Sequence, residues 1–236
     1  MRMKPIVILS AIHEEIEDFI SHYPNIQSQQ MGPFTFFHTM EHDQPLILGT
    51  SGVGKVAAAM TTQKIIDHYD PRYILFTGLA GALNPAYDIG DIIIADQCIQ
   101  YDIDASELGF PVGTIPYTEY HTFTPDAALL KLTQQIETDQ IVHTGTIITG
   151  DQFMTHEKRA HYQNLFDHFQ GDAIEMEGAA LAHVCTHNHT PFLLIRTISD
   201  KANEIASLDF SKFLEIASRH SFQLIRKLLN MIDSEV

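Results

Sequence analysis

Basic residues are scarce in this sequence of 236 residues. Lysine and arginine together number 14, against 30 aspartates and glutamates, which gives a formal net charge of -16 when histidine is neutral. Nucleic acids and anionic membranes are bound through basic surfaces that displace counterions, so this charge balance argues against both as partners. Hydrophobic residues (44%) and charged residues (19%) occur in the proportions of a folded chain that can bury a core.

Cysteines, long apolar runs and linkers are also few or absent. The two cysteines, Cys98 and Cys185, lie far apart within apolar segments, which argues against a disulfide framework and favours a reducing compartment, the cytoplasm. The apolar run Ile6–Ala11 is too short for a signal peptide, and no run approaches the ~18 apolar residues of a membrane span. Because no Pro- or Ser-rich linker interrupts the chain, we expect a single domain over residues 1–236.

Short apolar runs alternate with longer segments of helical periodicity. The short runs predict strands at Pro5–Ala11, Thr35–Met40, Pro45–Thr50, Arg72–Thr77, Asp91–Cys98, Val142–Thr149, Ala173–Met176 and Phe192–Ile198. The periodic segments predict helices at Glu14–Ser21, Val53–Asp70, Asp126–Glu137, Glu157–Phe169, Gly178–Asn188 and Leu208–Asp233. This alternation favours an α/β fold in which helices cover both faces of a largely parallel or mixed sheet, with the strands in 35–50 forming a hairpin.

The longest stretch without a clear pattern runs from Tyr101 to Pro125. A loop of that length in a compact domain is usually functional or a partner contact. In sheets of this kind, ligands gather at the carboxyl ends of the strands, so the residues that follow each predicted strand are the first candidates for chemistry.

The segment Gly49-Thr-Ser-Gly-Val-Gly-Lys-Val56 follows a predicted strand and opens a predicted helix, as a nucleotide-phosphate loop does. However, Val56 stands where such a loop needs a Ser or Thr hydroxyl for magnesium, which argues against a nucleotide triphosphatase. We interpret the segment as a Gly-rich turn between a strand and a helix, whose backbone amides face a ligand oxygen.

Two groups of histidines resemble zinc sites without meeting their geometry. His156 and His161 are five residues apart, so on a helix they diverge by roughly 140° and cannot share a metal. His183 and His187 have better spacing but lack a carboxylate partner, which is more typical of a solvated helix end. We therefore predict no metal site, and nothing in the sequence calls for a cofactor.

Acidic residues follow three of the predicted strands, in the segments Ile12–Glu15, Glu175–Glu177 and Arg196–Asp200. Each segment alone is explained by carboxylates that cap helix N termini and complement the helix dipole. Their coincidence at strand ends instead indicates one site that uses several carboxylates.

Six segments together form a recognisable pattern: Ser51–Ala59, Thr77–Gly81, Ile89–Ile92, Thr149–Phe153, Glu175–Glu177 and Arg196–Asp200. In this order and spacing they resemble the 5'-methylthioadenosine/S-adenosylhomocysteine nucleosidases of the nucleoside phosphorylase superfamily, over about residues 5 to 230. The resemblance implies a three-layer α/β/α, nucleoside phosphorylase-like fold with a mixed, partly barrel-like central sheet. It also implies a homodimer that binds a small adenine nucleoside.

The implied activity is hydrolysis of the N-glycosidic bond of 5'-methylthioadenosine and S-adenosylhomocysteine, which releases adenine and the 5-thio-ribose product. The resemblance gives Asp200 the role of general acid at adenine N7 and Glu15 that of activating the attacking water. Chemistry agrees, because bond cleavage builds positive charge on the ribose and negative charge on the base, so the site needs a proton donor and a carboxylate near the sugar.

The resemblance also implies how the substrate is held. Glu177 would bind the ribose hydroxyls beside the Met176 backbone, and Arg196 would help to position the water. Phe153 would stack on adenine, whose edge the Met154 backbone would read. The other substrate-binding residues implied are Ile12, Leu79, Glu175 and Ser199.

Three positions depart from the family pattern. Ile12 stands where a Met is common, Leu79 replaces a small hydroxyl residue, and Tyr101 replaces a His. None of these changes removes a catalytic carboxylate. Leu79 fills space near the ribose and the water, which leaves the identity of the 5' substituent open.

The segment from Leu108 to Pro116 matches the family loop that closes the alkylthio pocket of the neighbouring subunit. The residues implied for that pocket are Leu108, Phe110 and Pro116, which keep its aliphatic and aromatic character. A plain hydrophobic loop contact is the alternative.

Three other functions are weighed against this one. A purine nucleoside phosphorylase would use phosphate, which needs cationic ligands, whereas Glu15 and Phe76-Thr-Gly78 occupy the places where those enzymes carry arginine. A related nucleosidase would act on another adenine nucleoside, of the adenosine or 6-amino-deoxyfutalosine type, and Leu79 keeps that alternative open. A nonenzymatic nucleoside-binding protein is disfavoured because Glu15, Glu177 and Asp200 are all present.

Overall fold

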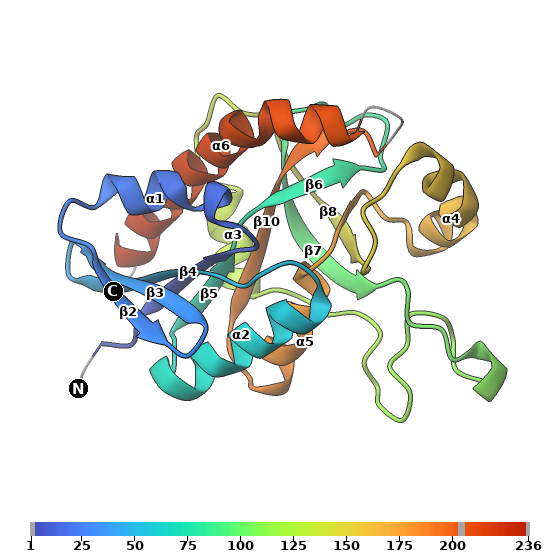
Figure 1. Ribbon diagram of the computed structural model, residues 1–236, viewed down its shortest axis with the longest axis horizontal. Helices are drawn as coiled ribbons and strands as arrows, with labels where there is room; N and C mark the ends of the chain where they lie inside the picture. Colours follow the sequence, from blue (N-terminus) through green and yellow to red (C-terminus); the bar gives the residue numbers. More distant parts are fainter. Residues whose placement is uncertain (1–2, 203–205, 235–236) are drawn as a thin grey trace.

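In the computed structural model, which describes residues 3–202 and 206–234, ten strands form one sheet (Figure 1). The strands are β1 (Ile6–Ser10), β2 (Gln27–Met31), β3 (Phe34–Glu41), β4 (Gln44–Thr50), β5 (Tyr73–Phe76), β6 (Leu79–Ala82), β7 (Ile92–Gln100), β8 (Val142–Thr149), β9 (Ala173–Glu175) and β10 (Phe192–Asp200). Their order in the sheet is β2-β3-β4-β1-β5-β10-β6-β9-β8-β7.

Strand β10 joins the two halves of the sheet. Its first residues pair in parallel with β5, and its later residues pair in parallel with β6. Residues Ile195–Thr197 also pair antiparallel with β7, which closes β7, β8, β9, β6 and β10 into a barrel. The mixed, partly barrel-like sheet implied by the resemblance is therefore confirmed.

Helices cover both faces of this sheet. The helical elements are η1 (His13–Glu15), α1 (Glu17–His22), α2 (Lys55–Tyr69), η2 (Ser106–Leu108), α3 (Ala127–Thr133), α4 (His156–Phe169), α5 (Gly178–His187) and α6 (Ala206–Ser234). Helices α2 and α5 lie on one face, whereas α1, α3 and α6 lie on the other, and α4 lies beside the barrel (Figure 1). Within the described residues, no helix is both long and apolar enough to cross a membrane.

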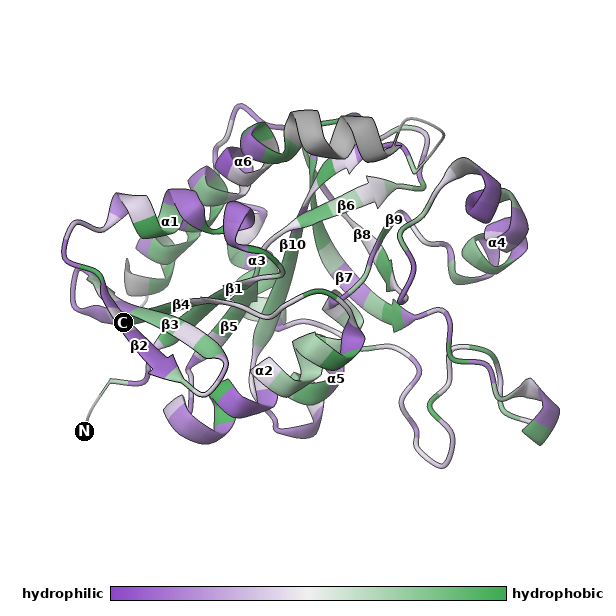
Figure 2. Cartoon of the chain, viewed as in Figure 1, coloured by the Kyte–Doolittle hydropathy of each residue, from purple (hydrophilic) through white to green (hydrophobic). Residues whose placement is uncertain are grey.

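Burial on both faces explains why the central strands are continuous apolar runs. In β1, Val7 and Leu9 point into the core shared with α2 and α5, whereas Ile6 and Ile8 point into the core shared with α1, α3 and α6. Figure 2 shows the same pattern, with hydrophobic residues along the central strands and polar residues on the outer segments. Each large aliphatic side chain buried in this way contributes about 1.5–3 kcal/mol.

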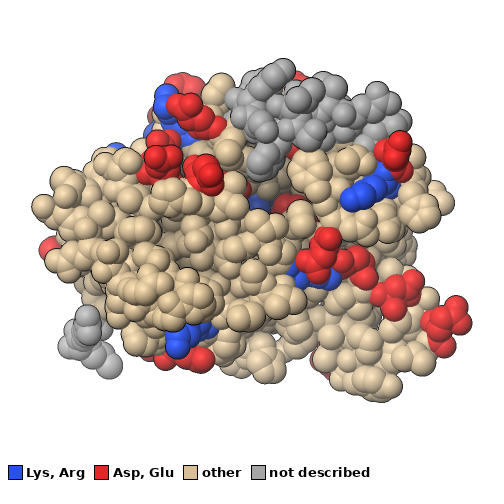
Figure 3. All heavy atoms as spheres, viewed as in Figure 1, with Lys and Arg blue, Asp and Glu red and all other residues tan. Residues whose placement is uncertain are grey.

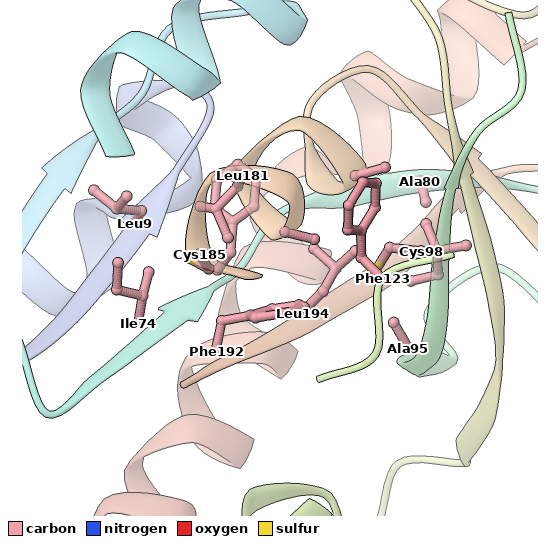
Figure 4. Packing of buried hydrophobic residues seen from close by; sticks show 14 of the residues in the cluster. Leu9, Ile74, Ala80, Ala95, Cys98, Phe123, Leu181, Cys185, Phe192 and Leu194 are labelled. Carbon is pink, nitrogen blue, oxygen red and sulfur yellow. The ribbon is translucent and has the colours of Figure 1, made fainter. Parts of the chain in front are cut away.

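Both cysteines lie in the core between α5 and the sheet, Cys185 on α5 and Cys98 on β7 (Figure 4). Cys98 and Cys185 are free and fully buried, and burial raises the pKa of both thiols. They are therefore packing residues, and they form no disulfide with each other.

Most predicted elements are present, but several boundaries were wrong. The predicted helix Glu14–Ser21 is split into η1 and α1 at Ile16, and the helix predicted to Glu137 ends at Thr133. Strands β2 and β6 were missed because β2 is a polar, exposed edge strand and β6 has only four residues, Leu-Ala-Gly-Ala. The predicted hairpin is confirmed as β3 and β4.

Helix α6 matches the prediction in its C-terminal half. Its apolar stripe is buried there, at Leu224, Ile225, Leu228, Leu229 and Ile232. The three- and four-residue spacing of the sequence predicts that Phe210, Phe213 and Ala217 belong to the same stripe, but their side chains lie outside the described part of the chain.

The structure supports a stability prediction at Gly150, directly after β8. A Cβ at this position would lie 2.4 Å from the ring of Tyr101, which is fully buried and packs edge-on against Phe166. Gly150→Ala should therefore cost about 1–3 kcal/mol of unfolding free energy, measured by urea denaturation. In a Tyr101→Leu background the same change should cost much less, and equal costs in the two backgrounds would contradict this packing argument.

Candidate active site

A cavity of about 190 Å³ opens at the carboxyl ends of β1, β9 and β10. The residues that line it are Ala11, Ile12, Glu15, Val53, Leu79, Ala80, Gly81, Gln152, Phe153, Met154, Ile174, Glu175, Met176, Glu177, Ser199 and Asp200. Figure 3 shows a hollow near the middle of the face in view. Sheet topology thus brings together the ends of strands that are far apart in sequence.

Most of the predicted site residues meet in this cavity. Glu15, Asp200, Ile12, Leu79, Phe153, Met154, Glu175, Met176, Glu177 and Ser199 all line it. Arg196 does not line the cavity, but its guanidinium donates a hydrogen bond to the carboxylate of Glu175, which does. Leu108, Phe110 and Pro116 lie on the long loop outside the cavity of their own chain.

Glu15 is held by backbone N–H groups from two strand ends. Its Oε2 accepts hydrogen bonds from Ala11 (2.9 Å) and Ile12 (3.1 Å), and its Oε1 accepts one from Leu79 (3.0 Å). Burial raises the pKa of Glu15, against the lowering effect of Arg196 and of these hydrogen bonds. A fixed carboxylate that readily takes up a proton suits a general base.

Glu175 and Arg196 form a fully buried ion pair, with Nη2 2.8 Å from Oε2. The same carboxylate accepts hydrogen bonds from the N–H groups of Glu177 and Gly178, and from the hydroxyl of Thr149. Arg196 also donates to the carbonyls of Phe76 and Ile195, and its guanidinium lies 4.2 Å from the centre of the Phe76 ring. The pair therefore fixes β9 against β10 beneath the cavity.

Glu177 directly precedes α5, as its N-cap residue, and its side chain contacts the Gly-rich turn before α2. Its Oε1 accepts a hydrogen bond of 2.8 Å from the Gly54 N–H. Burial raises the pKa of Glu177, and the neighbouring Glu175 and Glu15 raise it further. The surroundings of Glu177 therefore disfavour the ionised form of its carboxyl group.

The Gly-rich turn binds carboxylates of its own chain. In addition to the Gly54 contact with Glu177, the Lys55 N–H donates to Asp151 (2.9 Å), and the Lys55 ammonium pairs with Asp102. The backbone N–H groups at the N terminus of α2, which resembles a phosphate loop in sequence, thus bind two carboxylates, those of Glu177 and Asp151. The turn connects β4 to α2, as predicted.

Asp200 is the last residue of β10. Its Oδ2 accepts a hydrogen bond from the Ser199 hydroxyl (2.9 Å), and its Oδ1 accepts one from the Ala202 N–H (2.7 Å). The side chain is 4% exposed, so a proton exchanged there is largely shielded from water. These contacts keep the carboxyl directed at the cavity.

The cavity has an apolar wall as well as carboxylates. Ile12, Leu79, Ile174 and Met176 contribute to it, and Phe153 is 38% exposed at its edge. Sequence reasoning gave no role to Val53 or Gln152, although Val53 lies within the Gly-rich turn and Gln152 within the segment Thr149–Phe153.

The lining holds no basic side chain among the described residues, against four carboxylates. Within the same residues, no three histidine, cysteine, aspartate or glutamate side chains are grouped so that they could hold a metal ion. The geometry suits acid–base chemistry on a neutral ligand that becomes positively charged, with one side apolar.

Comparisons with known proteins agree with this geometry. A family model described as the phosphorylase superfamily matches residues 5–230. The 5'-methylthioadenosine/S-adenosylhomocysteine nucleosidase of Staphylococcus saprophyticus is 35% identical over 228 residues, which cover 95% of this chain and 99% of that protein. The aminodeoxyfutalosine nucleosidase of Campylobacter jejuni is 33% identical over 229 residues, which cover 96% and 98%.

Among solved structures, a Helicobacter pylori MTAN mutant with 5'-methylthioadenosine in the active site superposes with a TM-score of 0.92. It is 30% identical in sequence, and the match covers 98% of this chain and 100% of that one. The fold, the cavity and these matches lead to one assignment. The chain belongs to the phosphorylase superfamily and, within it, to the family of the 5'-methylthioadenosine/S-adenosylhomocysteine nucleosidases, which are N-glycosidic hydrolases.

Proposed function

We propose that this protein hydrolyses 5'-methylthioadenosine and S-adenosylhomocysteine to adenine and the 5-thio-ribose product. The observation that carries the proposal is the convergence of Glu15, Glu177 and Asp200 on one buried cavity that also has an apolar wall. The carboxylates suit cleavage of the N-glycosidic bond, and the apolar wall suits a 5'-alkylthio group, which gains only from exclusion of water.

The proposed mechanism uses two proton transfers. Asp200 donates a proton to adenine N7 as the bond between C1' and N9 breaks, so the bonding electron pair leaves with a neutral base. Water attacks C1' and gives a proton to Glu15, whose raised pKa favours that transfer. The buried carboxylates stabilise the positive charge that develops on the ribose, and Glu177 holds its hydroxyls.

Water is favoured over phosphate as the nucleophile. A phosphate ion would face four carboxylates and, among the described lining residues, no cation. The Arg196 guanidinium faces Glu175.

The test of this function is product analysis by NMR, with and without inorganic phosphate. We expect adenine and the free 5-thio-sugar at rates that phosphate does not raise. Formation of a sugar 1-phosphate would instead establish a phosphorylase.

Aminodeoxyfutalosine is a second candidate substrate, supported by Leu79 and by one of the relatives. Leu79 lines the cavity and supplies the N–H that binds Glu15, so a bulky aliphatic side chain lies beside the reacting centre. The Campylobacter jejuni relative acts, by its name, on aminodeoxyfutalosine. Comparison of kcat/KM for methylthioadenosine, S-adenosylhomocysteine, adenosine and aminodeoxyfutalosine decides among these substrates.

Asp200→Asn should lower kcat for adenine release on the order of 10²- to 10⁴-fold, because an amide of the same shape cannot donate the proton that N7 needs. Nucleoside binding, measured by calorimetry, should remain. Asp70→Asn is the matched control, since Asp70 is exposed and pairs with Lys4 far from the cavity. Wild-type turnover by Asp200→Asn would remove this residue from the mechanism.

We also propose a homodimer in which the loop over 108–116 closes the 5' pocket of the other subunit. Apolar side chains are exposed along one side of α2 and its preceding turn, at Val53 (56%), Val56 (71%) and Met60 (58%). Leu108 is 69% exposed on the loop, which extends away from the barrel (Figure 1). Figure 3 shows that a broad part of the face carrying α2 is free of charged side chains, which supports burial against a second copy.

Phe110→Ala tests this arrangement. Loss of a buried apolar wall costs about 1–3 kcal/mol, so KM for methylthioadenosine should rise on the order of 10-fold while KM for adenosine, which lacks the sulfur tail, changes little. Ile141→Ala is the control, because Ile141 is an exposed apolar residue (61%) at the amino end of β8. The cavity lies beyond the opposite, carboxyl end of that strand. An active monomer in sedimentation, or equal effects on both substrates, would contradict the shared pocket.

A further inference from the structure

Arg159, in the first turn of α4, binds three backbone carbonyls of other elements. Its Nη1 donates to the carbonyls of Ala82 (3.2 Å) and Lys201 (3.0 Å), and its Nη2 donates to that of Leu83 (2.8 Å). Ala82 is the last residue of β6, and Lys201 directly follows β10. Figure 1 shows α4 beside the end of β6, outside the barrel.

The Lys201 carbonyl belongs to the peptide unit that also carries the Ala202 N–H. That N–H donates to Asp200 Oδ1 at 2.7 Å. One rigid peptide plane therefore has Arg159 at its oxygen and the Asp200 carboxyl at its hydrogen. A cation at the oxygen polarises the peptide and strengthens the hydrogen bond at its other end.

The turn that contains this peptide is strained. Ala202 is fully buried and has a φ of 48°, in the left-handed region that is unfavourable for a residue with a side chain. It packs against Gly81, where a Cβ would lie 2.9 Å from Asp200 Oδ1 and 3.2 Å from the Ala202 Cβ. Such a conformation persists only where the surroundings hold it, and Arg159 provides one of the holding contacts.

Arg159 is also close in sequence to a second group of cavity residues. The residues that precede α4 include Gln152, Phe153 and Met154, which line the cavity. The neighbouring Lys158 donates to the Phe153 carbonyl at 3.1 Å. The start of α4 thus ties the segment 152–154 to the turn that follows Asp200.

We propose that Arg159 is a positioning residue for the general acid: it fixes the Lys201–Ala202 peptide, which in turn fixes the Asp200 carboxyl. This inference rests on the proposed function, because it assigns Asp200 the protonation of the leaving base. It predicts that loss of Arg159 impairs leaving groups that need a proton and spares those that leave without one.

The test compares two substrates. Methylthioadenosine needs a proton at N7, whereas the 4-nitrophenyl glycoside of 5-methylthioribose releases 4-nitrophenolate without one. Arg159→Met should lower kcat for methylthioadenosine at least 10-fold, with KM changed less than 3-fold, and should lower turnover of the nitrophenyl glycoside less than 3-fold. Arg159→Lys, which retains a donor, should restore part of the lost rate.

Arg219→Met is the matched control, because Arg219 is an exposed arginine on α6 that pairs with Glu215. It should leave both substrates unaffected. The positioning role would be overturned if Arg159→Met and Arg159→Lys each lowered kcat equally for the two substrates, or if kcat were unchanged in both variants. Neither result would contradict the proposed function. A wild-type protein that releases neither leaving group would overturn the proposed function itself, and the inference with it.

Discussion

The burial of three glutamates around one guanidinium is the constraint on which the site depends. Glu15, Glu175 and Glu177 are each about 5–6% exposed, and Arg196 is 1% exposed. Removal of a single partner from such a pair typically costs 3–5 kcal/mol, because the other charge is left buried. Arg196 directly neutralises Glu175, so Glu15 and Glu177 depend mainly on backbone N–H groups, and the raised pKa of both shows that this compensation is incomplete.

This incomplete compensation is useful for the chemistry. A ribose that becomes cationic as the base departs supplies the positive charge that the cavity lacks. In the proposed mechanism, the attraction of this ribose to Glu15 and Glu177 is stronger in the transition state than with the neutral substrate, and only such a difference accelerates the reaction. The desolvation that disfavours the ionised carboxylates of this cavity thus becomes, in the proposed mechanism, preferential stabilisation of the transition state.

The sequence predicted which carboxylates meet but not what holds them. Strand and helix alternation placed Glu15, Glu177 and Asp200 at strand ends. Parallel pairing of β1, β5, β10 and β6, together with antiparallel pairing of β9 with β6, brings those ends together. The contacts that orient them come from residues remote in sequence: Gly54 donates to Glu177 across 123 positions, and Arg159 reaches Leu83 across 76. Such contacts leave no periodic pattern in the sequence. The short strand β6, whose N–H groups and small residues complete the cavity, leaves none either.

Backbone anchoring links sheet register to chemistry. Glu15 is bound by N–H groups at the ends of β1 and β6, and Asp200 ends β10, which pairs with β6. Because β6 meets both residues, the separation of the proposed base, Glu15, from the proposed acid, Asp200, is set by the alignment of three strands rather than by side-chain rotamers. The register of β10 shifts between Ile198 and Asp200, and this irregularity leads into the strained turn at Ala202. A change that slides β10 along β6 would therefore displace Asp200 from Glu15 without touching either residue.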